Sequence, residues 1–244
     1  MIHSSSQSST RTTRKGLLKG GVCIVRSAKF QNPTSNYAAM TISPQQAFAI
    51  WYRLPEPEST LTLLAASTGL RISECLGLQW GDVDFTAQLI HVRRTWTAGR
   101  VGLPKSRTSN AAVPLHPLLA RYMETWHNAT PYSAEKDWVF PSFSLKGKKP
   151  RVANMLVEDH LRPAAVAAGV LKEGETVRFG YHNLRHSLAS FLVQAGTNPK
   201  TVQGLLRHAD VHTTLQIYAH SRNADHMTAQ GDMLAAMFAP PVVQ

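Results

Sequence analysis

Apolar side chains recur every three or four residues over most of the chain, the spacing typical of amphipathic helices. Residues 44–54 follow Ser43, which can cap a helix with a proline in its first turn. Residues 59–68 are nearly all apolar, so this helix is predicted to be central, and Gly69 suits its left-handed end. Two further helices are predicted over residues 116–126 and over residues 153–168, with a kink at Pro163.

The last third of the chain predicts three short helices joined by tight turns. Residues 182–195 carry an apolar stripe and stop at Gly196, which is a plausible helix end. Asn198 and the proline after it open the next helix, which ends near His208. A third helix is predicted from Val211 to His220. An amphipathic terminal helix is predicted over residues 225–238, with methionines on its apolar face.

Residues 81–116 are typical of β-structure, with partial alternation of apolar and polar side chains. Three short antiparallel strands are predicted, at residues 89–94, 101–103 and 111–115. Residues 97–100 are a candidate hairpin turn. The predicted fold class is therefore α+β, mostly α, with a small three-stranded antiparallel sheet beside the helices.

Composition changes the picture in three ways. Residues 1–40 are rich in Ser, Thr, Gly and positive charge, so they are predicted to be a flexible basic tail before a folded domain at 41–244. Two cysteines, no apolar leader and no membrane-length stretch favour a reducing cytoplasmic setting. A net charge of +11 and a pI near 10.0 indicate a polyanionic partner, most simply nucleic acid.

Polar groups interrupt the apolar faces of the last helices. His182 and Arg185 are three residues apart and share one helix face. His208 and Tyr218 follow on the next two helices, and the tight joints can bring all four together. Arg matches phosphate with a fork of donors, His moves a proton near neutral pH, and Tyr can act as a nucleophile. The group indicates phosphoryl transfer through a phosphotyrosine.

Simpler interpretations exist for each residue alone. A single tyrosine on an amphipathic helix usually packs, and a single histidine usually caps or faces solvent. His182 and His186 are four apart and are spaced to share a metal ion. The glutamate that follows the first histidine of a zinc-protease helix is absent, however, and no carboxylate cluster is present to hold a metal. Only the combination of residues favours the catalytic interpretation.

A second candidate anion site lies at the end of the central helix. Arg71 directly follows the predicted turn and precedes a new helix, where a guanidinium can lie over the helix N-terminus. Its flanking residues are apolar, so the charge needs a partner. Glu74, three residues on, can orient neighbouring polar groups.

These motifs together resemble the tyrosine recombinase family, also called phage integrases. The family pattern His-x-x-Arg is met by His182 and Arg185, Leu-x-His by Leu206 to His208, and Thr-Thr-Leu-x-x-Tyr by residues 213–218. The stretch T-G-L-R-x-x-E-x-x-x-L-x-W is met at residues 68–80. One departure is Arg207, where a glycine is common.

The resemblance implies the fold of the DNA breaking-rejoining enzymes and a role for each matched residue. The phenol of Tyr218 attacks a DNA phosphorus, which leaves a 3′-phosphotyrosine and a free 5′ hydroxyl. The other implied roles are Arg71 and Arg185 on the phosphate oxygens, His182 as acid/base, His208 as hydrogen-bond donor, Lys105 as general acid, and Glu74 as supporting residue. Neither a metal nor another cofactor is implied.

Basic residues elsewhere are predicted to contact the DNA backbone. The stretch 143–151 is a basic loop, and Arg107 competes with Lys105 for the role at the leaving oxygen. Arg207 adds positive charge beside the predicted phosphate site. The predicted DNA-binding residues are Arg107, Lys146, Lys148, Lys149, Arg151 and Arg207.

The resemblance also implies partners and leaves alternatives. It implies double-stranded DNA, a homo-oligomer assembled on it, exchange of the C-terminal helix between protomers, and an association with the bacterial nucleoid rather than a membrane. Residues 1–40 would then be the linker remnant of a DNA-clamping domain. The alternatives are a type IB topoisomerase-like enzyme that relaxes DNA without a defined site, and a non-catalytic DNA-binding protein of the same fold.

Overall fold

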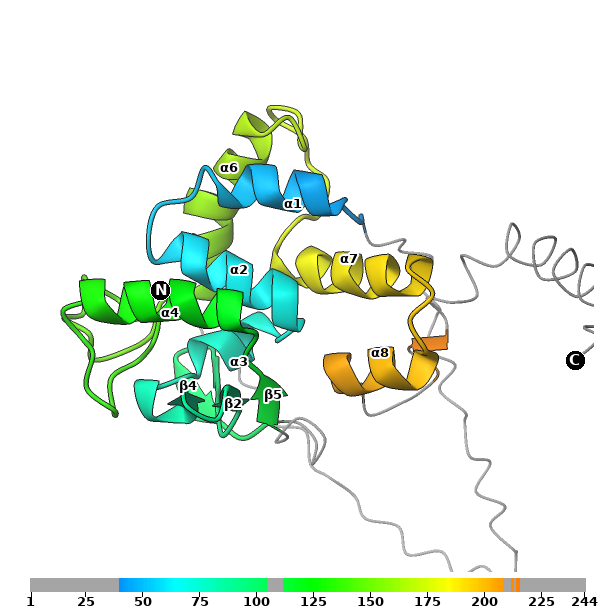
Figure 1. Ribbon diagram of the computed structural model, residues 1–244. Helices are drawn as coiled ribbons and strands as arrows, with labels where there is room; N and C mark the ends of the chain where they lie inside the picture. Colours follow the sequence, from blue (N-terminus) through cyan, green and yellow to red (C-terminus); the bar gives the residue numbers. More distant parts are fainter. Residues whose placement is uncertain (1–39, 105–111, 209–211, 213, 216–244) are drawn as a thin grey trace, which may run out of the picture. The chain divides into compact units, whose positions relative to one another are not determined.

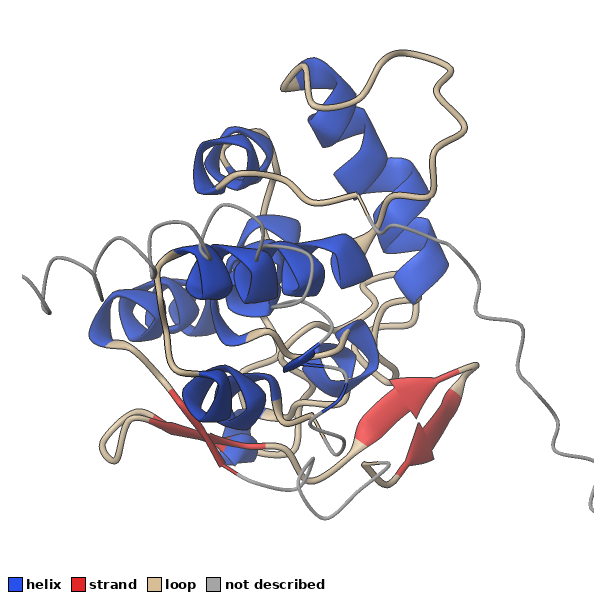
Figure 2. Cartoon of the chain, turned by 90° about the vertical axis from the view of Figure 1, so that its right-hand side faces the viewer, coloured by secondary structure: helices blue, strands red, loops and turns tan. Residues whose placement is uncertain are grey.

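The computed structural model describes residues 40–104, 112–208, 212, 214 and 215. Helices dominate this part of the chain (Figure 1), and the strands lie along the lower edge of the view in Figure 2. The predicted class, mostly helical with a small antiparallel sheet, is confirmed. The helices are α1 (Pro44–Trp51), α2 (Glu58–Thr68), α3 (Ile72–Leu76), α4 (Pro117–Ala129), α5 (Ala153–Leu156), α6 (Arg162–Ala167), α7 (Tyr181–Gln194) and α8 (Pro199–Leu206).

Helix α2 is central, as its apolar sequence predicts. It contacts α1, α3, α4 and α7, and Leu61 and Leu64 are among its buried side chains. Before it, α1 begins at the predicted cap, where Ser43 Oγ accepts a hydrogen bond from the backbone N–H of Gln46. After it, Gly69 adopts a left-handed conformation with φ of 65° and ends the helix. Local sequence signals therefore determine where α1 begins and where α2 ends.

The strands form two small antiparallel sheets rather than one. The three-stranded sheet has the order β1-β2-β5, from Val83–Asp84, Leu89–His91 and Ala112–Pro114. The hairpin of β3 (Thr95–Thr97) and β4 (Arg100–Gly102) stands apart from it. The predicted turn at residues 97–100 is present, but the strand predicted at 101–103 belongs to this hairpin. Ala98 and Gly99 both have positive φ and turn the chain directly back on Thr95–Thr97.

The helix predicted over residues 153–168 is interrupted as expected near Pro163. A π-helical segment, η3, spans Val157–Leu161 between α5 and α6. A separate 3-10 turn, η1, spans Trp80–Asp82 earlier in the chain. Proline lacks a backbone N–H and its ring collides with the carbonyl four residues earlier. The wider π turn in front of Pro163 accommodates both effects.

Helices α7 and α8 follow the predicted pattern closely. The chain turns at Gly196, with φ of 73°, and Asn198 caps α8 by accepting from the backbone N–H of Lys200 at 2.8 Å. Arg207 ends α8 in the left-handed conformation, with φ of 51°. Ala189, Val202 and Leu206 form a small hydrophobic cluster between α7 and α8, separate from the main core. Among the described residues, this small cluster is the apolar support of α8.

No helix within residues 40–104 and 112–208 is long and apolar enough to cross a membrane.

Candidate functional site

The turn between α2 and α3 positions Arg71 at the N-terminus of α3. Thr68 Oγ1 donates to the Leu64 carbonyl at 2.6 Å and accepts from the Leu70 N–H at 3.2 Å, which fixes the turn. Arg71 has extended backbone angles and serves as the N-cap residue of α3. Its backbone N–H donates to Glu74 Oε2 at 2.8 Å. The arginine therefore stands at a helix start, as its place in the sequence predicts.

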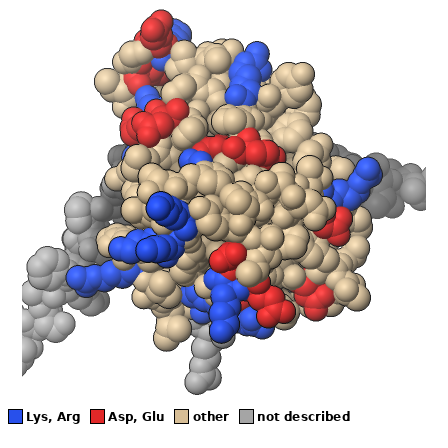
Figure 3. All heavy atoms as spheres, turned by 90° about the vertical axis from the view of Figure 1, so that its left-hand side faces the viewer, with Lys and Arg blue, Asp and Glu red and all other residues tan. Residues whose placement is uncertain are grey.

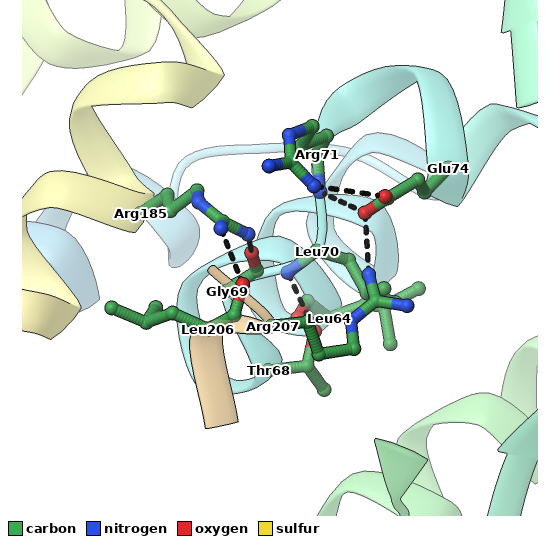
Figure 4. A network of polar contacts seen from close by, with 9 residues as sticks. All are labelled: Leu64, Thr68, Gly69, Leu70, Arg71, Glu74, Arg185, Leu206 and Arg207. Carbon is green, nitrogen blue, oxygen red and sulfur yellow. Dashed lines mark hydrogen bonds and ion pairs between the residues drawn. The ribbon is translucent and has the colours of Figure 1, made fainter. Parts of the chain in front are cut away.

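Glu74 is a buried carboxylate shared between two guanidinium groups. Its Oε1 accepts from Arg71 Nη1 at 3.1 Å, and its Oε2 accepts from Arg207 Nη2 at 2.5 Å (Figure 4). The side chains of Glu74 and Arg207 are 2% and 3% exposed, whereas that of Arg71 is 34% exposed. Arg71 is therefore the member of this network that solvent and a ligand can reach.

Arg185 reaches the same turn from α7. Its guanidinium donates to the carbonyl oxygens of Gly69 and Leu206, so one side chain links the end of α2 to the end of α8. The residue is only 4% exposed. Burial first, and then the positive charge of Arg71, lowers the Arg185 pKa to about 10, so it stays charged at neutral pH.

His182 and His208 lie beside these guanidinium groups. Desolvation lowers the pKa of each imidazole to about 4, and the positive charges of Arg185 and Arg71 act on both in the same direction. His208 Nδ1 is 2.9 Å from the hydroxyl oxygen of Thr214, which is fully buried. Both imidazoles are therefore neutral at pH 7, and that of His208 is held in place by a buried hydroxyl.

The structure brings together the predicted site residues that it describes at the junction of the α2–α3 turn, α7 and α8. Their roles in a reaction stay predictions. The predicted residues Lys105, Arg107 and Tyr218 lie outside the described residues. The gathered residues are Arg71, Glu74, His182, Arg185 and His208.

The predicted DNA-contacting residues have two kinds of surroundings. Lys146, Lys148 and Lys149 are exposed on the loop after α4, which lies away from α7 and α8 in Figure 1. Figure 3 faces that side of the molecule and shows several groups of lysine and arginine side chains, with acidic side chains between them. Arg151 instead pairs with the buried carboxylate of Glu58, and its side chain is 21% exposed.

Arg207 requires a correction. The sequence predicts a DNA contact there, but the residue is 4% exposed and its guanidinium pairs with Glu74. Burial lowers the pKa of this arginine, while the carboxylate of Glu74 acts in the opposite direction. The pairing was missed because its partner lies 133 residues earlier in the chain. One sequence signal did point to an unusual setting for Arg207. The family pattern commonly has a glycine at this position, and glycine is the usual residue where the backbone is left-handed.

The alternative of a metal site has little structural support. The rings of His182 and His186 meet edge to face, with centroids 4.5 Å apart. Among the residues that the structure describes, no group of three or more His, Cys, Asp and Glu side chains could hold a metal ion. The chemistry of this donor set, guanidinium and imidazole, instead suits an anion with several oxygen atoms.

Known proteins are similar to this chain in sequence. Tyrosine recombinase XerD of Brucella abortus is 34% identical over 154 residues, covering 63% of this chain and 45% of that protein. The ICEBs1 integrase of Bacillus subtilis is 26% identical over 168 residues, covering 66% and 44%. The chain thus spans less than half the length of either relative.

Solved structures of integrases and recombinases have the same fold. The integrase of the Tn1549 transposon, in complex with transposon right end DNA, superposes with a TM-score of 0.63 at 21% identity, covering 82% of this chain and 68% of that one. The XerA recombinase gives a TM-score of 0.57 at 20% identity, covering 86% and 68%. The profile of the phage integrase family matches residues 38–225. With the motifs and the fold in agreement, the chain belongs to the phage integrase family of tyrosine recombinases.

Proposed function

We propose that this chain is the catalytic part of a site-specific DNA recombinase or integrase that breaks and rejoins strands through a 3′-phosphotyrosine. The observation that carries the proposal is the junction of the α2–α3 turn, α7 and α8, where two arginines and two neutral histidines share one site. Family membership and the recombinase names of the relatives support it.

Arg71 and Arg185 are proposed to bind the scissile phosphate. Arg71 is partly exposed, and Glu74 holds only one of its terminal nitrogens within the described residues. Each terminal nitrogen of Arg185 carries a second hydrogen beyond the one given to a main-chain carbonyl. Both residues thus have donors to spare for the non-bridging oxygens, where charge develops in the transition state.

The histidines are the proposed proton carrier and hydrogen-bond donor. A pKa of about 4 leaves His182 unprotonated at pH 7, so its ring nitrogen can accept the proton of the attacking phenol. In the proposed tautomer, His208 Nδ1 accepts from the Thr214 hydroxyl, so the proton of the neutral ring is on Nε2, which can donate to the phosphate. The same surroundings that lower both pKa values therefore suit them to act as neutral groups.

The proposed exchange balances without an external energy source. The phenol oxygen of Tyr218 bonds to phosphorus, the bond to the 5′ oxygen breaks, and Lys105 supplies the proton to that oxygen. A 5′ hydroxyl of another strand then reverses the step and releases the tyrosine. Because the phosphotyrosine conserves the phosphodiester bond energy, neither ATP nor a metal is part of the proposal.

Double-stranded DNA is the proposed partner. The exposed lysines 146, 148 and 149 lie on one loop, and side chains of this kind contact backbone phosphates without reading sequence. Arg107 is proposed to do the same. A net charge of +11 supports a polyanionic partner, and in a bacterial cell we place the chain with the nucleoid.

Assembly on DNA is proposed to use an apolar groove between α1, α2 and α7. The groove has a volume of about 290 Å³, and its lining includes Ala47, Phe48, Ala66, Leu188 and Phe191. Phe48 is 60% exposed and Phe191 is 47% exposed in the single chain. The methionine-bearing face of residues 225–238 has matching chemistry. We propose that this segment of one protomer occupies the groove of its neighbour.

The proposed domain boundary lies near residue 40. The compact unit begins at Ala38 and the family match begins at residue 38, which supports treating 41–244 as the catalytic domain. The relatives are more than twice as long as the part they share with this chain. We therefore propose that residues 1–40 connect to a DNA-clamping domain.

Strand cleavage on a nicked suicide substrate tests the function. The chain is expected to cleave a cognate site and to stay covalently attached to the 3′ phosphate of the cleaved strand. In Arg71→Ala and Arg185→Ala the cleavage rate should fall about 10²-fold or more. Relaxation of supercoiled plasmid without a defined site would favour the topoisomerase alternative. Salt-dependent binding without cleavage on any cognate site would favour the non-catalytic alternative and contradict the proposal.

A further inference from the structure

Arg207 adopts a backbone conformation that is unfavourable for any residue with a side chain. Its φ of 51° and ψ of 44° are left-handed, where a side chain costs about 1–2 kcal/mol relative to glycine. Glycine would satisfy the helix end without that cost. The chain instead holds an arginine whose guanidinium is 3% exposed and paired with Glu74 at 2.5 Å. An outlier held in place by a specific buried contact points to a role for that contact.

The contact determines how Glu74 holds Arg71. A carboxylate and a guanidinium frequently pair through two parallel hydrogen bonds. Here Arg207 and the Arg71 backbone N–H occupy Oε2, so the Arg71 side chain keeps one bond, to Oε1 at 3.1 Å. The remaining donors of Arg71 stay available on the exposed side of the network.

The same residue links two parts of the site. Arg207 reaches inward to Glu74 of α3, while the ring of the next residue, His208, lies 2.9 Å from the hydroxyl oxygen of Thr214. Arg185 makes the second link, between Gly69 and Leu206. These polar links join the end of α8, next to His208, to the elements that carry Arg71 and Glu74.

We infer that Arg207 is a positioning residue for Arg71, acting through the shared carboxylate of Glu74. It prevents two-point pairing between Arg71 and Glu74, and it leaves the Arg71 fork directed at the phosphate. This inference rests on the proposed function for its activity readout.

The test compares cleavage and binding in Arg207→Gly and Arg207→Lys. Glycine removes the pair but suits the backbone, and lysine keeps the charge and the apolar stem but loses the fork. We expect single-turnover cleavage by Arg207→Gly to fall about 10–100-fold, the usual effect of removing an outer partner. DNA affinity should change less than about threefold, since a buried guanidinium contacts no phosphate. Lysine should restore part of the rate.

A double-mutant cycle separates positioning from general stability. Arg207→Gly combined with Glu74→Gln should be no slower than the slower single variant, because both remove one interaction. Arg94→Gln is the control, since it breaks another ion pair to a buried carboxylate, that of Asp82 at 2.7 Å. It should lower stability yet leave the rate of the folded protein unchanged. Multiplied effects in the double variant, a wild-type rate in Arg207→Gly, or a loss confined to DNA affinity would overturn the inference.

Failure of the proposed function would look different. If the unaltered chain forms no covalent product on any cognate site, the function fails and the positioning role is read by NMR. The Arg71 side-chain N–H resonance should then shift in Arg207→Gly and not in Arg94→Gln. An unshifted resonance would overturn the inference independently of activity.

Discussion

Gly69 decides how closely α8 approaches the turn that carries Arg71. It combines a left-handed φ of 65° with crowded surroundings. A Cβ at this position would lie 2.7 Å from Leu206 Cδ2 and 3.2 Å from Leu188 Cδ2. Its carbonyl also accepts from Arg185. One small residue therefore permits the contact between three elements of the site.

Gly69→Ala is expected to damage this contact, and the chain offers a matched control. Gly169 has a similar φ of 70°, but nothing lies within 4 Å of its Cβ position. Both substitutions carry the backbone cost of about 1–2 kcal/mol. Gly69→Ala should lose about 1–3 kcal/mol more from overpacking, measured by urea unfolding. Equal losses in the two variants would show that α8 does not pack there as described.

The site histidines couple stability to pH. His182 and His208 have pKa values of about 4, and the pKa of His186 is also lowered by burial and by Arg185. In the unfolded chain each titrates near 6.5. Between these values the unfolded chain binds more protons, so protonation favours unfolding. The stability that depends on these neutral histidines is fully present above about pH 7 and is lost as the pH falls from 6.5 toward 4.

The midpoint of urea unfolding should therefore drop between pH 7 and pH 5. A double variant, His182→Gln with His208→Gln, should drop less, because two of the responsible groups are gone. The same titration of His91→Gln gives the control, since this histidine lies on β2 and is not one of the site residues. Parallel curves for the double variant and the unaltered chain would contradict the assignment of these pKa values.

At the scale of elements, α8 packs on α7 through a small apolar cluster, as far as the described residues show. Its apolar support is the cluster of Ala189, Val202 and Leu206, with Leu188 and Leu192 partly buried beside it. Helix α2, in contrast, is buried in the main core and contacts four other helices. Elements with few buried contacts open at lower free energy than the whole domain.

Hydrogen exchange should show this difference directly. Amides of α8 are expected to exchange faster than those of α2 under native conditions. Leu206→Ala should accelerate exchange in α8 further and cost about 2–4 kcal/mol of local stability, because Leu206 is fully buried. Exchange at the same rate throughout α2 and α8 would mean that the two helices open together.

Sequence signals predicted those features of the elements that depend on near neighbours. The caps at Ser43 and Asn198 and the stop at Gly69 involve residues within a few positions of one another. Sheet membership was less accessible, because Leu89 pairs with Pro114 across 25 positions while the hairpin turn closes locally. The burial of Arg207 likewise depends on Glu74, far away in the sequence. Strand pairing and the burial of Arg207 therefore depend on residues far away in the sequence, which local patterns do not identify.

At the scale of the whole molecule, the apolar groove connects the single chain to the proposed assembly. Phe48 lines it, and its ring stacks on that of Tyr52 with centroids 6.2 Å apart. Tyr52 is 74% exposed and is not part of the groove lining. The two aromatic residues therefore distinguish the groove from the surface beside it.

Phe48→Glu should weaken assembly on DNA, because a charge in an apolar groove loses solvation without gaining a partner. Electrophoretic mobility shifts on a two-site DNA should show single occupancy and a loss of cooperativity of about tenfold or more, while binding to one site is retained. Tyr52→Glu serves as the control and should behave as the unaltered chain. Equal cooperativity in Phe48→Glu would remove the groove as an acceptor.

The most direct measurement identifies the covalent bond itself. The chain is incubated with a nicked cognate substrate, digested, and examined by mass spectrometry. The account predicts one DNA-linked peptide, joined through a 3′-phosphate to Tyr218, and no such peptide from Tyr218→Phe. A linkage to any other residue, or an adduct that persists in Tyr218→Phe, would contradict it.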